Sequence, residues 1–172
     1  MTYVLSAGSL GLITKVDQRL VKVAQLAITL TTQDFGFTEE QSRTLAEEAQ
    51  KIAKGDSQTL RSHHLINDGS LTWEKTPSAI GYSGALDAVP WNGTAFVWEW
   101  PRIYQVAAAF RAASDQLNTP ITWGGVWDKL MSEYGSTPAE IAAEELAYVA
   151  RQKAAGNHRV LIDGPHYELG RN

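Results

Sequence analysis

The chain of 172 residues contains no cysteine, and this absence removes several kinds of chemistry at once. Without thiols there can be no disulfide framework, no cysteine-ligated zinc and no thiol nucleophile, so a metal site would have to use histidine and carboxylate ligands. Basic residues are also few, because 15 Lys and Arg stand against 19 Asp and Glu and give a formal charge of −4. Proteins that hold a phosphate backbone cluster Lys and Arg, so we expect no nucleic-acid partner.

Long apolar runs are missing as well. No stretch reaches the length that crosses a bilayer, so we expect no membrane insertion. The first residues, MTYVLSAGSLGLITKV, lack the basic segment, apolar core and small-residue cleavage site of a secretory signal. We therefore expect no signal peptide.

Helix and strand patterns alternate along the chain, and its length predicts one domain over residues 1–172, which we interpret, with the family resemblance given below, as α+β. Apolar spacing, capping residues and stop signals predict helices, and short apolar or alternating runs predict strands. The predicted helices cover residues 9–31, 39–55, 98–118 and 136–157. The predicted strands cover residues 34–38, 85–91, 121–127 and 159–169, and residues 63–84 are predicted to be loop.

Histidine is scarce, and one of the four lies in the sequence LIDGPHYELG near the end of the chain. In that sequence Gly164 permits a sharp bend and Pro165 fixes its own φ, so Asp163 and His166 can face one cavity from a rigid turn. A metal held by histidines and a carboxylate can keep one position open, and a second carboxylate nearby can take a proton from water. The ordinary alternative is a solitary histidine in the core or on the surface. His158, at a helix end, is assigned no catalytic role.

An early predicted helix and five motifs that follow it in order resemble a known family, and the resemblance spans residues 9–169. The motifs read TEEQSRTLAEEAQ, KGDSQTLRSHHL, SGALDAVPW, ITWGGVWDKL and DGPHYEL. This series is similar to that of the zinc-dependent D,D-peptidases and L-alanyl-D-glutamate endopeptidases of bacterial cell walls and phage endolysins. The resemblance implies a small antiparallel sheet with flanking helices and a zinc site in the cleft, as in hedgehog and D,D-peptidase folds. It also implies that His64, Asp87 and His166 bind zinc, that Asp163 is the general base, and that Arg43 steadies the oxyanion.

Each of these roles has a plainer alternative. Arg43 lies four residues before Glu47 and can form an ordinary ion pair on a helix surface. Asp163 can be a loop or capping acid. Asp87 can be a carboxylate at a strand end that is held by backbone donors.

The chain departs from the family pattern between the first two predicted ligands. His64 and Asp87 are 23 positions apart, which is longer than is usual in the family and indicates an insertion near 66–82. The insertion makes Asp68 a rival ligand, four residues after His64, although Asp87 is preferred because a strand can hold it rigidly. His63 precedes His64, and neighbours on an extended segment point to opposite sides, so one of the two is expected to reach the metal.

Two further departures lie later in the chain. Val126 stands where the family commonly has Asp after Trp-Gly-Gly, which leaves Asp128 as a candidate substitute. The predicted helix after Trp127 indicates a second insertion, near 132–158.

These observations together predict a zinc-dependent peptidoglycan hydrolase. By the resemblance it is a phage-type endolysin that cuts the L-alanyl-D-glutamate bond of the stem peptide, acts as a monomer, and is made in the host cytoplasm before release to the cell wall. A D-alanyl-D-alanine carboxypeptidase or dipeptidase is the close alternative. A zinc-stabilised binding module without activity is the alternative of another class, and the presence of both Asp163 and Arg43 disfavours it, because a structural zinc needs neither.

Overall fold

The computed structural model describes residues 16–34, 84–88 and 97–170. In this part of the chain three helices, α2 (Gln18–Asp34), α5 (Trp100–Gln116) and α6 (Pro138–Ala154), surround a small sheet. The sheet is formed by β1 (Ala85–Asp87), β2 (Ile121–Trp123) and β3 (His166–Leu169), and a short 3₁₀ helix, η2 (Met131–Glu133), follows β2. The predicted α+β class is therefore confirmed. None of the described helices is long and apolar enough to cross a membrane.

The sheet is antiparallel with the order β1-β3-β2, so the last strand lies in its centre. Leu86, Tyr167 and Trp123 are register partners across the three strands and share one face. All three side chains are buried, and Phe110 of α5 stacks on Tyr167 with ring centroids 3.8 Å apart. This face of the sheet therefore packs into the core, and the opposite face is left for the polar residues of β1 and β3.

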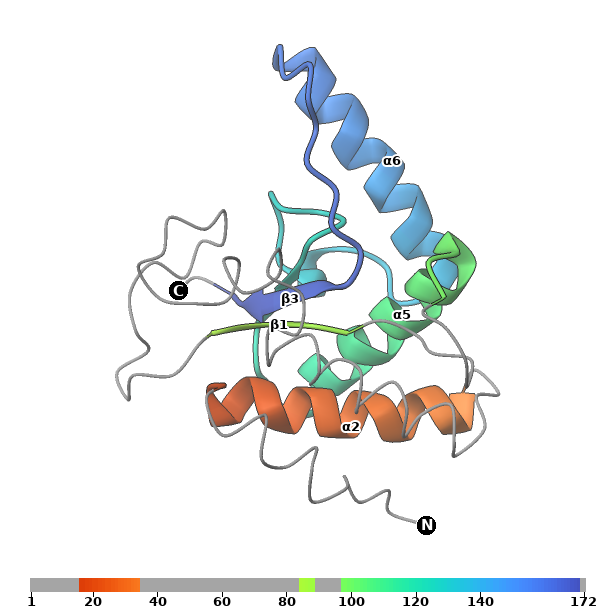
Figure 1. The fold of residues 1–172 in the computed structure, drawn as a ribbon, viewed down its shortest axis with the longest axis vertical. Helices are drawn as coiled ribbons and strands as arrows, with labels where there is room; N and C mark the ends of the chain where they lie inside the picture. The colour runs from red at the N-terminus through yellow and green to blue at the C-terminus, as the bar shows by residue number, and fades with distance from the viewer. Residues whose placement is uncertain (1–15, 35–83, 89–96, 171–172) are drawn as a thin grey trace.

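Helices α2 and α5 form the layer beneath the sheet (Figure 1). The residues of α2 that the apolar spacing places in the core are buried, among them Leu20, Val23 and Ala27. Three consecutive alanines, residues 107–109, are buried in α5, and side chains this small let two helices approach closely. The core thus holds the sheet from one side.

The predicted helix over 9–31 begins later than expected. Within the described residues, Val16 and Asp17 precede the helix, and α2 starts at Gln18. The Asp17 carboxylate accepts a hydrogen bond of 2.9 Å from the backbone N–H of Arg19, which is how a capping residue ends the extended backbone and begins a helix. Sequence spacing could not detect this start, because Val16 fits the helical period although it lies outside the helix.

The predicted final strand over 159–169 is also shorter in the structure, where β3 holds only His166–Leu169. Proline cannot donate to a strand ladder, and Gly164 and Pro165 form a turn ahead of the strand. Before that turn the chain runs back alongside α6 (Figure 1), where the Tyr148 hydroxyl donates to the carbonyl oxygen of Leu161.

Helix α6 matches its prediction closely. Thr137 caps it, because its hydroxyl oxygen accepts a hydrogen bond from the Glu140 N–H while the Glu140 carboxylate accepts one from the Thr137 N–H, and Pro138 occupies the first turn. Its buried residues are Ile141, Glu145 and Tyr148. The Tyr104 hydroxyl of α5 donates a bond of 2.8 Å to Glu145, which joins the two helices. The predicted elements at 34–38, 39–55 and 63–84 lie outside the described residues apart from Asp34, the last residue of α2, and Gly84.

Candidate metal centre

Strands β1 and β3 bring Asp87 and His166 face to face. The two residues are register partners, and both side chains are buried. His166 Nδ1 lies 3.3 Å from Asp87 Oδ1. On the other side of the ring, His166 Nε2 lies 3.3 Å from Oε2 of Glu168, which is also buried. The imidazole is therefore placed between two carboxylates on the face of the sheet that points away from the core.

The two carboxylates determine the proton affinity of the ring. Burial alone would lower the pKa of His166, but the hydrogen bonds and negative charges of Asp87 and Glu168 outweigh it and raise the pKa to about 9. A metal ion at this position would replace a ring proton, as metal binding to histidine generally does.

Asp163 is brought to the same place by the turn that precedes β3. Its carbonyl oxygen accepts a hydrogen bond of 3.1 Å from the His166 N–H, and its own N–H donates a bond of 2.8 Å to the carbonyl oxygen of Gly124. The Ala88 N–H donates to the carbonyl oxygen of Pro165 at 2.8 Å, which ties the turn to β1. The side chain of Asp163 is half-buried, whereas Asp87 and His166 are buried. Of the three, Asp163 is thus the group with access to water.

The Trp-Gly-Gly sequence at the end of β2 supports this turn from the other side. The Gly124 N–H donates to the carbonyl oxygen of His166 at 2.9 Å, and the indole Nε1 of Trp123 donates to the carbonyl oxygen of Gly164 at 2.6 Å. A Cβ atom on Gly124 would overlap the Asp163 carbonyl oxygen and press on the His166 Cβ. Only glycine therefore allows the backbone of the turn to approach this closely.

Asp87, Asp163 and His166 form a group whose ligand atoms all lie within 4.8 Å of one another. A tetrahedral zinc ion with bonds of about 2.0–2.1 Å places neighbouring ligand atoms roughly 3.3 Å apart. The separation of His166 Nδ1 and Asp87 Oδ1, 3.3 Å, has this value. The imidazole of His166 and the carboxylate of Asp87 are also donor types that zinc binds. These residues therefore fit a zinc ion, with room in the ligand count for one more histidine.

The structure describes three of the five predicted site residues. Asp87, Asp163 and His166 come together from two strands and a turn, although they are far apart in the sequence. Arg43, His64, and the rival ligands His63 and Asp68, lie outside the described residues, as does the whole insertion near 66–82.

Asp128 does not take the place of the missing acid after Trp-Gly-Gly. Its carboxylate accepts two hydrogen bonds from the Arg151 guanidinium, at 2.9 and 3.0 Å. The hydrogen bond from Arg151 lowers the pKa of Asp128. Arg151 also pairs with Glu144, so this acid belongs to a group of ions that joins α6 to the segment after β2.

Sequence reasoning missed two residues next to the metal group. Glu168 contacts His166 directly, and Trp127 lies beside it with ring centroids 5.0 Å apart. The signal for Glu168 was available, since it lies two positions after His166 and strand alternation places both on one face. No comparable signal exists for Trp127, because it follows a glycine turn whose geometry the sequence does not specify.

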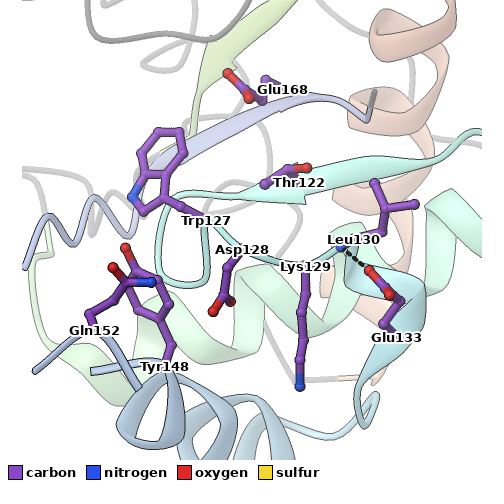
Figure 2. A pocket seen from close by; sticks show the side chains of 9 residues that line it. All are labelled: Thr122, Trp127, Asp128, Lys129, Leu130, Glu133, Tyr148, Gln152 and Glu168. Atoms are coloured by element: carbon purple, nitrogen blue, oxygen red, sulfur yellow. Dashed lines mark hydrogen bonds between the residues drawn. The ribbon is translucent and has the colours of Figure 1, made fainter. Parts of the chain in front are cut away.

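A pocket of about 500 Å³ is lined in part by Trp127 and Glu168, the two residues that lie beside His166. Its other side chains come from β2, from the segment after β2, from η2 and from α6 (Figure 2). In Figure 2 the Trp127 indole is drawn above the Tyr148 and Gln152 side chains, and the Asp128 and Lys129 side chains are drawn to their right. The second predicted insertion, near 132–158, therefore supplies part of a wall beside the metal group.

Comparison with known proteins gives two findings. The family model for the phage L-alanyl-D-glutamate peptidase matches residues 1–146, a range that includes Arg43, His64 and Asp87 and ends before Asp163. The crystal structure of the L-Ala D-Glu endopeptidase ChiX from Serratia marcescens is similar at 23% sequence identity and a TM-score of 0.45, over 96% of this chain and 89% of that one. No curated protein matches the sequence.

Proposed function

The chain belongs to the phage L-alanyl-D-glutamate peptidase family and is a peptidoglycan hydrolase, and on this premise we propose that it works with a zinc ion held by His64, Asp87 and His166. The observation that carries the proposal is the position of His166 Nδ1, which lies 3.3 Å from Asp87 Oδ1 in a group that Asp163 completes. Asp87 and His166 supply two ligands, and one nitrogen ligand more would complete the three protein ligands of a catalytic zinc and leave the fourth position open, with Asp163 free to act as the base. His64 supplies it by the family resemblance.

When bound, the ion supplies Lewis-acid chemistry: it polarises a carbonyl oxygen and makes a neighbouring water more acidic. Asp163, half-buried at the edge of the group, accepts a proton from the attacking water and returns it to the departing amine of D-glutamate. Arg43 donates hydrogen bonds to the oxyanion that develops on the L-alanyl carbonyl, because a guanidinium keeps its charge at all working pH values. The buried Asp87 and His166 hold their positions on the sheet throughout.

The role of Asp163 can be separated from that of the ligands. Asp163→Ala should leave zinc bound and lower turnover by roughly 100-fold or more, as expected for the loss of a positioned proton acceptor. Zinc content by mass spectrometry and turnover on purified peptidoglycan are measured on the same preparation. If zinc disappears together with turnover, Asp163 is a ligand and not the base.

The scissile bond is tested on the products. After digestion of purified peptidoglycan, mass spectrometry should find new amino termini at D-glutamate. Release of free D-alanine would instead indicate the alternative D-alanyl-D-alanine carboxypeptidase activity. As a phage-type endolysin, the enzyme is further proposed to act as a monomer on the stem peptide, to be made in the host cytoplasm and to reach the wall after release.

A further inference from the structure

Glu168 lies next to the proposed metal site but has no part in the mechanism above. Its side chain is 3% exposed, on the central strand β3, and its register partners in β1 and β2 are Ala85 and Thr122. Burial of a carboxylate is costly unless hydrogen bonds or charges compensate it. The Nε2 atom of His166, 3.3 Å from Oε2, provides such a contact.

The geometry of the ring assigns its two nitrogens to different tasks. A carboxylate without a proton can only accept hydrogen bonds, so a hydrogen bond between Glu168 and Nε2 places the ring proton on Nε2. Nδ1 faces Asp87, which belongs with Asp163 to the metal group, whereas Glu168 lies outside that group. With its proton on Nε2, a neutral imidazole has its lone pair on Nδ1, on the side of Asp87.

We propose that Glu168 is a positioning residue that holds the His166 ring by its Nε2–H and thereby presents Nδ1 to the metal ion. The backbone makes this arrangement rigid, because both residues project from one face of a strand that is paired on both sides. Carboxylates that accept the second N–H of a metal-bound histidine raise the basicity of the ring and fix its orientation. This inference rests on the proposed metal site. It adds that His166 binds through Nδ1 and that Glu168 selects this nitrogen.

Zinc affinity gives the first test. Competition with a chromophoric chelator should show that Glu168→Ala weakens zinc binding by about 10–100-fold. Glu168→Gln should weaken it less, because its amide oxygen can still accept the Nε2–H. Glu145→Ala is the matched control. Glu145, on α6, is similarly buried at 6% exposure, and its carboxylate accepts a hydrogen bond from the Tyr104 hydroxyl of α5. Equal zinc affinity in wild type and Glu168→Ala, or an equal loss in Glu145→Ala, would overturn the inference.

The second test determines which ring nitrogen of His166 carries the proton, and its deciding measurement uses the wild-type protein. In the zinc-loaded wild-type protein with ¹⁵N-labelled histidine, nuclear magnetic resonance should find the His166 proton on Nε2, at the low field typical of a bond to a carboxylate. In Glu168→Gln this proton should move upfield. A proton on Nδ1 of the zinc-loaded protein would overturn the inference while leaving a metal site in place. A wild-type protein that binds no zinc would contradict the proposed metal site itself.

Discussion

The indole Nε1 of Trp123 donates a hydrogen bond of 2.6 Å to the carbonyl oxygen of Gly164, and both groups are buried. The bond joins the end of β2 to the turn that carries Asp163 and His166. It is a connection between residues 41 positions apart, so the sequence of the turn alone does not determine where its two side chains lie.

Trp123→Phe should show how much this bond contributes. The substitution keeps an aromatic ring in the core but leaves the Gly164 carbonyl without its indole donor, at a cost of about 1–3 kcal/mol in the free energy of unfolding. Zinc affinity should fall as well, because the turn is loosened. Urea unfolding and chelator competition measure the two effects. Trp98→Phe is the control, since Trp98 is exposed and its substitution should change stability by less than about 0.5 kcal/mol. A Trp123→Phe protein as stable as wild type would contradict the importance of the bond.

Gly124→Ala should damage the metal centre through the backbone. A Cβ atom there would overlap the Asp163 carbonyl oxygen, so the turn must shift, at a cost of about 1–3 kcal/mol. Gly156→Ala provides a comparison at a distant site: Gly156 has φ +88°, in a region that alanine disfavours by about 1–2 kcal/mol, but no atom lies near its added Cβ.

Zinc binding separates the two glycine variants. Gly124→Ala should lose most of its zinc affinity, and Gly156→Ala should lose stability while keeping that affinity. Thermal unfolding and chelator competition on both proteins provide the measurement. Similar zinc affinities in the two variants would mean that the close approach at Gly124 does not position the ligands.

Local signals in the sequence predicted much of the described fold. Thr137, Pro138 and Gly156 mark the ends of α6 with caps and a stop, and the structure places them there. Asp87 was expected at a strand, and it is the last residue of β1. These predictions succeed because capping and strand patterns depend on neighbours in the chain. The starts of α2 and β3 were misplaced, because a capping hydrogen bond and a glycine-proline turn interrupt patterns that continue in the sequence.

Local patterns in the sequence could not predict how the site residues come together in space. The turn holding Asp163 and His166 was predicted from Gly164 and Pro165, yet nothing in the sequence specified that Asp87 would be the register partner of His166. Register depends on strand pairing between distant segments, which one sequence does not specify. Strand alternation places Glu168 on the same face as His166, but the sequence does not specify which ring nitrogen of His166 faces Asp87, so the role of Glu168 was not predicted.

The stability of the wild type relative to Glu145→Gln should depend on pH. Burial raises the pKa of the Glu145 carboxyl, although the hydrogen bond from Tyr104 opposes this. Between the unfolded-state pKa of about 4.3 and the higher folded-state pKa, the folded protein binds more protons, so wild-type stability falls as pH rises. Glutamine does not titrate, and its amide oxygen can still accept the Tyr104 bond.

The melting temperature of Glu145→Gln minus that of wild type should therefore increase as the pH is raised from about 4 to about 7. Calorimetry at several pH values measures this difference. Glu133→Gln is the control for the substitution, because Glu133 is exposed and its carboxylate bonds to the Leu130 N–H. A difference that shrinks with rising pH would contradict the raised pKa.

Anomalous X-ray diffraction at the zinc absorption edge, from crystals of the zinc-loaded enzyme, tests the metal centre most directly. We predict one peak at about 2.0–2.2 Å from Asp87 and from His166 Nδ1. His64 should provide a further ligand, Asp163 should lie nearby without binding, and Glu168 should accept the Nε2–H of His166. The absence of a peak between Asp87 and His166, or a peak bound through His166 Nε2, would contradict this arrangement.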